Sequence, residues 1–164
     1  MIKTLAFDPG VTTGYAQGVI EQEGPMYITT GENSWTHGDV WRFIQEFAPA
    51  FLITERFDSR HTRYKQGVEL YSRELIGIFN MYCEFNECKL ILQQPMKGGK
   101  SAVVGFAGSN TTYFSDDRLK QDAIYKSGKG HANDAARHLL YWYWFGSGGQ
   151  FDSRNRGYKS GLLS

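Results

Sequence analysis

Short apolar runs separated by turn residues dominate the first third of the chain. Residues 2–7 form an apolar-rich run that ends at an Asp-Pro-Gly turn signature, and residues 12–20 resume a pattern rich in β-forming residues. This pattern predicts a β-hairpin, and residues 26–31 can supply a third strand. Residues 39–47 place apolar side chains at helical spacing, which predicts a helix after the three strands.

Strands and helices alternate in the rest of the chain. Residues 50–54 are a short buried-strand candidate that ends at Glu55, and residues 67–85 have the spacing of the longest helix. The remaining predicted segments are a fifth strand over residues 89–92, a long Gly- and Ser-containing connection over 95–112, a short helix over 116–125 and a closing helix over 131–145. This order predicts a mixed five-stranded α/β sheet flanked by helices.

The length of 164 residues suits one domain with a single well-formed core. We place this domain at residues 1–147. Residues 148–164 are rich in Gly, Ser and Arg, so we expect them to form a flexible tail that packs poorly or orders on a partner.

Composition bounds the class of protein. No apolar run is long enough to cross a membrane, and the N-terminus leads directly into a strand-like segment, so we expect neither a membrane span nor a signal peptide. An intracellular, cytoplasmic protein is the expectation. Cys83 and Cys88 are too few for a disulfide scaffold and lack zinc-site spacing, so we expect reduced thiols.

The net charge of +1 hides an uneven distribution of charge. Residues 56–65, 94–130 and 150–164 together hold thirteen basic and five acidic residues, a balance of +8, whereas the remaining chain holds five basic and twelve acidic residues, a balance of −7. Basic loops around an acidic centre suit an enzyme that grips phosphates and cuts them with metal ions. Ordinary solvated loops are the alternative.

Four residues are candidates for a metal centre. Asp8 closes the first predicted strand and Glu55 the fourth, so neighbouring strands would bring both carboxylates to one edge region of the sheet. His131 and Asp134 are three residues apart at the start of a helix and hence share a face. Hydrolysis of phosphodiesters needs such hard oxygen ligands from distant parts of the chain.

Each of these residues alone has a structural interpretation. Asp8 suits a turn, Glu55 suits a solvated strand end or an ion pair, and His131 suits a helix cap. Asp134 is a favourable charge near a helix N-terminus. The combination of the four is what favours a metal-dependent nuclease.

The motifs resemble those of RuvC-type Holliday-junction resolvases of the RNase H-like superfamily, especially the small phage-encoded members. The resemblance covers the chain from the first strand to the last helix, in the order of that family. It rests on FDPG at residues 7–10, TGYA at 13–16, ITE at 53–55 and HANDAA at 131–136.

The resemblance implies a fold, a site and a reaction. It implies an RNase H-like fold in which Asp8, Glu55, His131 and Asp134 are catalytic residues that bind two Mg²⁺ or Mn²⁺ ions. It also implies a homodimer that acts in DNA recombination and repair, in the host cytoplasm if phage-encoded. Paired nicks in a four-way junction would leave 5′-phosphate and 3′-hydroxyl ends. Whether His131 ligates a metal ion or moves a proton stays open.

Candidates for DNA contact lie in the basic segments. Interleaved aromatic and basic residues after Glu55 would supply base stacking and phosphate contacts together. One aromatic there would correspond to the residue that the family inserts at the junction, although Phe57 also suits a core position. The candidates are Arg56, Phe57, Arg60, Arg63, Tyr64, Lys65, Lys97, Lys100, Lys120 and Lys129, with Arg118 and Lys126 as further phosphate ligands.

Several competing interpretations are weaker. The GGKS at residues 98–101 lacks the first glycine of a phosphate-binding loop because residue 94 is Gln, so we expect no nucleotide cofactor. His138 has no cysteine nearby that would favour zinc and is assigned to packing. A sugar kinase or actin-like ATPase needs two such domains. A catalytically inactive junction-binding protein, or a nuclease for flaps or RNA–DNA hybrids, remains as the alternative function.

Overall fold

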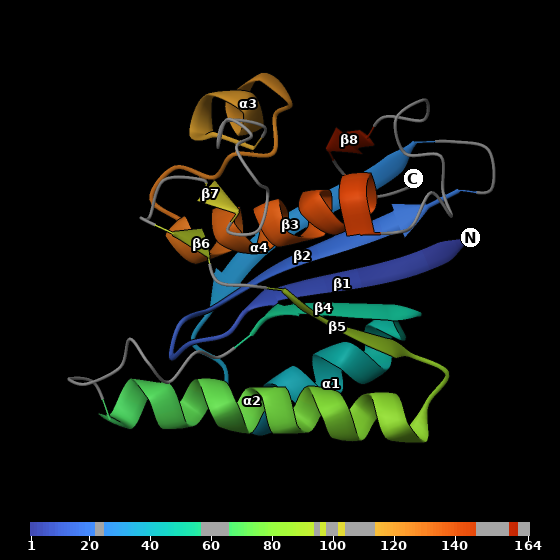
Figure 1. Cartoon of the computed structure of the whole chain (residues 1–164), viewed down its shortest axis with the longest axis vertical. Helices are drawn as coiled ribbons and strands as arrows, with labels where there is room; N and C mark the ends of the chain where they lie inside the picture. Colours follow the sequence, from blue (N-terminus) through green and yellow to red (C-terminus); the bar gives the residue numbers. More distant parts are fainter. Residues whose placement is uncertain are drawn as a thin grey trace.

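In the computed structural model, strands and helices form three layers around a central sheet (Figure 1). The structure describes residues 1–21, 25–56, 66–93, 96–97, 102–103, 114–146 and 158–160. The predicted mixed five-stranded sheet in a single domain with flanking helices is confirmed, in the order β5-β4-β1-β2-β3.

The sheet combines antiparallel and parallel pairing. The strands β1 (Ile2–Asp8), β2 (Thr13–Ile20) and β3 (Met26–Asn33) form an antiparallel meander. The strands β4 (Phe51–Glu55) and β5 (Lys89–Gln93) extend it on the other side of β1, parallel to β1 and to each other. The middle of β1 is buried on both faces, because helices pack on each face of the sheet.

Successive side chains of β1 point to opposite faces of the sheet and belong to two separate hydrophobic cores. Leu5 and Phe7 pack on one face, where Phe7 stacks on Phe79 at a ring-centroid distance of 4.8 Å. Ala6 points to the other face, whose core contains Leu139 and Trp142. The near-continuous apolar run of β1 therefore reflects burial on both faces of the sheet, rather than one buried and one solvent-exposed face.

The helices α1 (His37–Phe47) and α2 (Gln66–Phe85) cover the first face (Figure 1). A reciprocal capping box between Thr36 and Asp39 fixes the start of α1. Ala48, at φ 51°, ends it in the left-handed region. Both helices bury one apolar stripe against the sheet, which is the behaviour their helical spacing predicts.

The helices α3 (Asp116–Gln121) and α4 (Gly130–Tyr141) cover the second face, and α4 continues into a π-helical turn at Trp142–Gly146. In α4 all side chains from Ala135 to Leu140 are buried. This burial includes the polar residues Arg137 and His138, so α4 is the element whose polar groups need internal partners.

Three details differ from the prediction. The helix expected over residues 116–125 ends at Gln121, because Ala123 adopts φ 56° in the left-handed region. A two-stranded hairpin of β6 (Met96–Lys97) and β7 (Ala102–Val103) lies within the predicted long connection. The strand β8 (Tyr158–Ser160) adds a sixth, parallel strand beside β3.

The strand β8 lies within the segment that the sequence assigned to a tail. Three residues between glycines carry too little periodicity to be recognised as a strand. The other tail residues lie outside the described part of the chain, so the flexibility of the tail stays a prediction. Among the described helices, none combines the length and the apolar character needed to cross a bilayer.

Candidate active site

A row of polar residues crosses the sheet at the ends of four strands. Glu55 pairs with Gln93 across β4 and β5. Asp8 pairs with Gly14, and Gly14 pairs with Glu32, across β1, β2 and β3. The pairing of the preceding residues of β1 and β4 brings Asp8 beside Glu55. The sheet register thus places these five residues in one line.

All four side chains of this row point toward α4. Asp8 meets His131, Glu32 meets the start of α4, and both Glu55 and Gln93 meet His138. Residues in one row of a sheet share a face because side chains alternate along each strand. The ends of four strands and the face of α4 therefore enclose one polar strip.

Gly14 brings the start of α4 close to the strip. A Cβ atom on residue 14 would lie 2.0 Å from the carbonyl oxygen of His131 and 2.8 Å from the amide nitrogen of Ala132. Only glycine allows backbone to approach the sheet this closely. The glycine of the Thr-Gly pair after the Asp-Pro-Gly turn thus has a packing role, because it allows α4 to lie directly over Asp8.

His131 and Asp8 form a close contact within the strip. Nδ1 of His131 lies 2.6 Å from Oδ2 of Asp8. The hydrogen bond to Asp8 raises the pKa of His131, partial burial opposes this, and the negative charges of Asp8, Glu32 and Asp134 raise it further. Three carboxylates therefore surround this imidazole and favour its cationic form.

Asp134 lies one turn further along α4. Burial raises the pKa of its carboxyl group, the negative charge of Asp8 raises it further, and Arg137 opposes both. Arg137 is itself buried, with its guanidinium bonded to Asp134, Asp116 and the carbonyl of Phe114. A carboxylate held close to another carboxylate in a partly buried site is typical of a centre that accepts a cation.

Glu55 faces a residue that sequence reasoning assigned only to packing. Oε2 of Glu55 lies 3.5 Å from Nε2 of His138. His138 is indeed fully buried, yet its other ring nitrogen lies 2.6 Å from Oε1 of Gln93, and Nε2 of Gln93 donates to the carbonyl of His138. His138 is thus a polar member of the strip as well as a core residue.

Comparison with solved structures places this geometry in a known architecture. No protein-family model and no curated protein matches the sequence. RuvC of Thermus thermophilus in complex with Holliday junction substrate superposes at TM-score 0.63 and 13% identity, covering 91% of this chain and 97% of that chain.

Two further resolvases superpose in the same way. The fowlpox virus Holliday junction resolvase gives TM-score 0.58 at 14% identity, covering 86% of this chain and 97% of that one. The yeast mitochondrial Holliday junction resolvase Ydc2 gives 0.50 at 13% identity, covering 86% and 78%. This chain has the RuvC-type resolvase fold.

The RuvC-type fold places the four predicted metal ligands along the polar strip. Asp8 and Glu55 end neighbouring strands, and His131 and Asp134 lie on the first turn and a half of α4 above them. Carboxylate oxygens are the ligands that Mg²⁺ and Mn²⁺ prefer, and a neutral imidazole nitrogen is a common metal ligand. The residue types therefore fit a divalent ion.

These donors have protein partners in this structure. Asp8 is bonded to His131, Asp134 to Arg137, and Glu55 faces His138. Within the described part of the chain, no group of three or more His, Cys, Asp or Glu side chains has the spacing of a formed metal cage. If an ion bound here, these side chains would leave their protein partners and ligate the ion instead.

Sequence reasoning missed three members of the strip in this RuvC-type fold, namely Glu32, Gln93 and His138. The side chain of Glu32 is only 10% exposed; its carboxylate lies 3.3 Å from the amide nitrogen of Ala132 and 3.5 Å from Nζ of Lys129. Gln93 ends β5 beside Glu55, so the parallel register was the signal that would have found it. His138 follows Asp134 by four residues on the same helix face.

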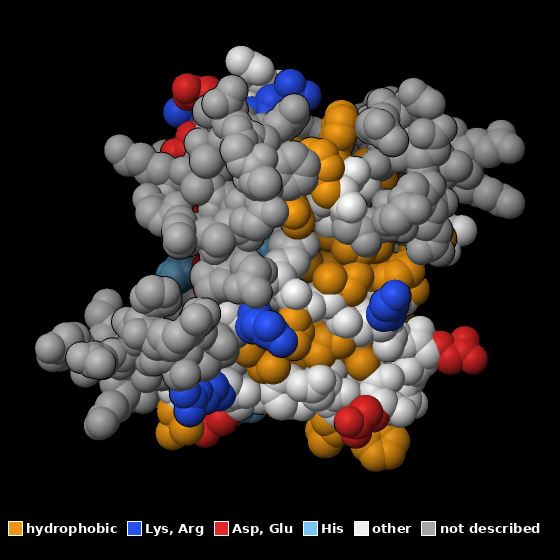
Figure 2. All heavy atoms as spheres, viewed as in Figure 1, with side chains coloured by type: hydrophobic (Ala, Val, Ile, Leu, Met, Phe, Trp, Pro, Cys, Tyr) orange, Lys and Arg blue, Asp and Glu red, His pale blue; other side chains and the backbone are white. Residues whose placement is uncertain are grey.

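Most of the predicted DNA contacts lie outside the described residues, namely Phe57, Arg60, Arg63, Tyr64, Lys65 and Lys100. Arg56 is exposed directly after β4, and Lys120 lies near Asp117 and above the ring of Tyr125. Lys129 lies at the start of α4, and only the backbone of Lys97 is described. On the face in Figure 2, the described Lys and Arg side chains stand in separate places rather than in one patch.

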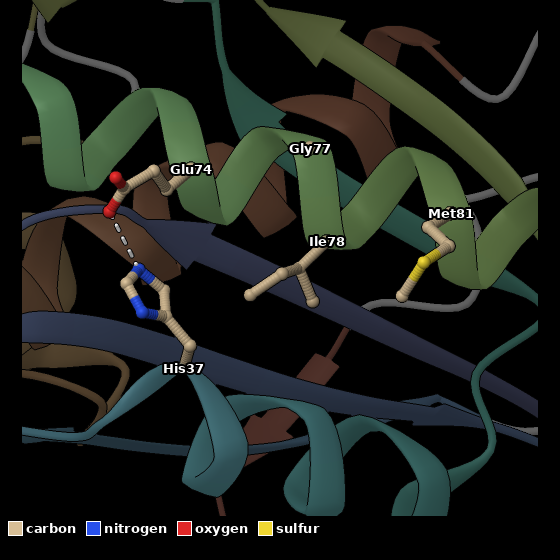
Figure 3. A pocket seen from close by; sticks show the side chains of 5 residues that line it. All are labelled: His37, Glu74, Gly77, Ile78 and Met81. Atoms are coloured by element: carbon tan, nitrogen blue, oxygen red, sulfur yellow. Dashed lines mark ion pairs between the residues drawn. The ribbon is translucent and has the colours of Figure 1, made fainter.

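A shallow cleft lies on the other side of the RuvC-type sheet, between α1 and α2. Figure 3 shows His37 reaching across it to Glu74, with Nε2 and Oε2 3.0 Å apart, while Ile78 and Met81 line it from α2. It contains none of the predicted catalytic residues. The free thiols Cys83 and Cys88, with sulfur atoms 3.2 Å apart, also belong to this side.

Proposed function

We propose that this protein is a divalent-metal-dependent endodeoxyribonuclease that resolves four-way DNA junctions. The observation that carries the proposal is the contact of Asp8 with His131, because it joins the first strand to the last helix at the strip where Glu55 and Asp134 also lie. The fold is shared with structures named as Holliday junction resolvases, one of them in complex with its junction substrate.

Each of the four residues has a proposed role. The carboxylates of Asp8, Glu55 and Asp134 would hold two Mg²⁺ or Mn²⁺ ions. When bound, these ions supply a hydroxide nucleophile at neutral pH and stabilise the leaving oxygen. His131, surrounded by carboxylates, ligates an ion or accepts a proton at Nδ1 once its bond to Asp8 is exchanged.

The surrounding residues keep these groups in place. Arg137 holds Asp134 from inside the protein, so this carboxylate keeps its direction while its exposed side faces the strip. The carboxylate of Glu32 accepts a hydrogen bond from the backbone N–H of Ala132 at the start of α4. This bond fixes the distance between α4 and Asp8. The products would be 5′-phosphate and 3′-hydroxyl ends, and a homodimer would present one site to each of two opposing strands.

Cleavage of a labelled four-way junction tests the proposal. The wild-type protein and Asp8→Asn/Asp134→Asn are incubated with the junction and with a linear duplex, in Mg²⁺ or EDTA. Symmetric nicks on the junction alone, abolished by EDTA and by the double variant, are the expected result. Asp117→Asn is the matched control, because Asp117 is an exposed carboxylate on α3 remote from the strip.

Two other results would contradict the proposal in different ways. Binding of the junction without cleavage in any divalent ion leaves a catalytically inactive binding protein. Equal cleavage of flaps, RNA–DNA hybrids or linear duplex leaves a nuclease but removes the preference for junctions, since metal ligands alone do not encode branch shape.

A further inference from the structure

His138 occupies an unusual position for a core residue. Its side chain is fully buried, yet it lies one turn after Asp134 on the face of α4 that covers the polar strip. Its neighbours there are Gln93 and Glu55, which end adjacent strands. Any buried histidine needs partners for its ring nitrogens, and here both partners belong to the polar strip.

The hydrogen bonds of Gln93 determine which ring nitrogen carries the proton. The side-chain amide of Gln93 faces the carbonyl of His138 at 3.0 Å, and only its Nε2 can donate there. Its Oε1 must then face Nδ1 of His138, at 2.6 Å. Because Oε1 only accepts, Nδ1 carries the hydrogen, and Nε2 of the neutral ring carries a lone pair.

That lone pair points at another acceptor. Nε2 of His138 has no hydrogen-bond partner among the described residues, and it faces Oε2 of Glu55 at 3.5 Å. Two facing acceptors in a buried place are unfavourable unless a proton or a metal cation lies between them. Two ligand atoms each about 2.1 Å from one ion are roughly 3.0–3.5 Å apart, so the spacing suits shared ligation.

The hydrogen bond from Nδ1 also matches this role. Histidines that ligate metals donate the other ring N–H to a fixed acceptor, which sets the ring orientation and increases ligand basicity. Gln93, held by the backbone of α4 itself, is such an acceptor. The carboxylate of Glu55 is 31% exposed, so an ion can reach it from the open side of the strip.

We propose that Nε2 of His138 ligates a divalent ion together with Glu55, as an additional ligand beyond the four predicted from sequence. This inference rests on the metal-dependent function proposed above. Imidazole nitrogen binds a first-row transition ion such as Mn²⁺ more readily than Mg²⁺, which prefers an all-oxygen shell. The site therefore binds Mn²⁺ more tightly than Mg²⁺, and the preference depends on His138.

Pulsed electron paramagnetic resonance of bound Mn²⁺ tests the ligand directly. In the full chain carrying His37→Gln, His61→Gln and His131→Gln, His138 is the only remaining histidine. Labelling histidine with ¹⁵N identifies any coupling of a directly bound imidazole. The expected result is a histidine coupling that changes between ¹⁴N and ¹⁵N protein. Mn²⁺ bound to this variant without this coupling overturns the proposal, as does a wild-type protein that binds no Mn²⁺.

Affinity provides an independent measurement. Titration calorimetry should show Mn²⁺ affinity reduced at least 10-fold in His138→Gln, with a smaller loss for Mg²⁺. His37→Gln is the matched control, since His37 also faces a carboxylate but lies on the opposite side of the sheet. Equal losses of affinity for Mn²⁺ and Mg²⁺ in a folded His138→Gln variant would overturn the proposed selectivity. If His138→Gln does not fold, the resonance experiment still tests the ligand, because its variant keeps the buried His138.

The two proposals fail separately. If the wild type cuts junctions but Mn²⁺ bound to the variant with His138 as its single histidine shows no coupling, the nuclease function stands and this ligand is refuted. If that variant shows the coupling but the wild type cuts no DNA, the ligand stands and the nuclease function is refuted.

Discussion

The bond between Asp8 and His131 sets the charge state of the candidate site before any ion binds. The hydrogen bond to Asp8 is the largest cause of the raised pKa of His131. A proton on His131 serves as the local counter-charge to the carboxylates. Because metal ions bind the neutral imidazole, ion binding at His131 would release this proton.

Replacing Asp8 should therefore lower the pKa of His131 in the metal-free protein. NMR titration of the ring should show a lower midpoint in Asp8→Asn than in the wild type. A group whose folded pKa is raised contributes stability below its unfolded pKa, and this contribution is lost as the pH rises through the folded value. The wild type should thus lose stability relative to Asp8→Asn as the pH rises above about 6.5. An unchanged midpoint would contradict the assignment.

Gly14 permits a backbone contact that no other residue allows. Gly14→Ala should destabilise the protein by roughly 3 kcal/mol or more, because the added methyl group overlaps the carbonyl of His131. Urea denaturation measures this. Gly77→Ala is the control: Gly77 lies exposed within α2 with no atom near its would-be Cβ, so alanine should stabilise by about 0.5–1 kcal/mol. Equal effects of the two variants would contradict the close approach.

The four proposed metal ligands could be chosen from the sequence because they combine strand ends with a helix face. Glu32 could not, since its role depends on the antiparallel register that sets it beside Gly14. His138 was assigned to packing because no cysteine that would favour zinc lies near it in the sequence. Only the direction of Nε2 toward Glu55 separates the two roles.

At the scale of elements, α4 joins the candidate site to the interior. Arg137 lies on the buried side of the helix and bonds three acceptors, on α3, on α4 and in the segment before α3. A planar guanidinium can serve three acceptors in fixed directions, which an ammonium group cannot. The position of α3 relative to α4 therefore depends on this side chain.

Arg137→Lys should destabilise the protein by about 1–3 kcal/mol despite the retained charge. The change in the free energy of urea unfolding measures this loss. Arg42→Lys is the matched control, because Arg42 pairs with Asp39 on the exposed side of α1 and should change stability by less than about 0.5 kcal/mol. A similarly small effect at both positions would show that Arg137 does not organise α3.

Element prediction succeeded where periodicity was long and failed where it was short. The strand β1 and the helix α2 carry enough apolar positions to define their type. The end of α3 depended on a left-handed Ala123, which no propensity predicts. The strand β8 exists because β3 offers a free edge, and such an edge is a property of the sheet rather than of three residues.

At the scale of the whole molecule, the proposed homodimer makes a prediction about strand cleavage. A mixed dimer of wild type and Asp8→Asn/Asp134→Asn, purified through two different tags, should nick a cruciform plasmid once. The expected product is an open circle, whereas the wild-type dimer should also give linear DNA. Linear product from the mixed dimer, or a monomer in analytical ultracentrifugation, would contradict one site per subunit.

The contact between Asp8 and His131 spans 123 positions of the chain. During synthesis the first strand leaves the ribosome long before α4 is translated, and domains fold as units once their parts are present. An incomplete chain therefore lacks the helix that completes the site. A chain that stops before α4 should therefore lack the proposed activity, because Asp8 and Glu55 would have neither His131 nor Asp134 above them.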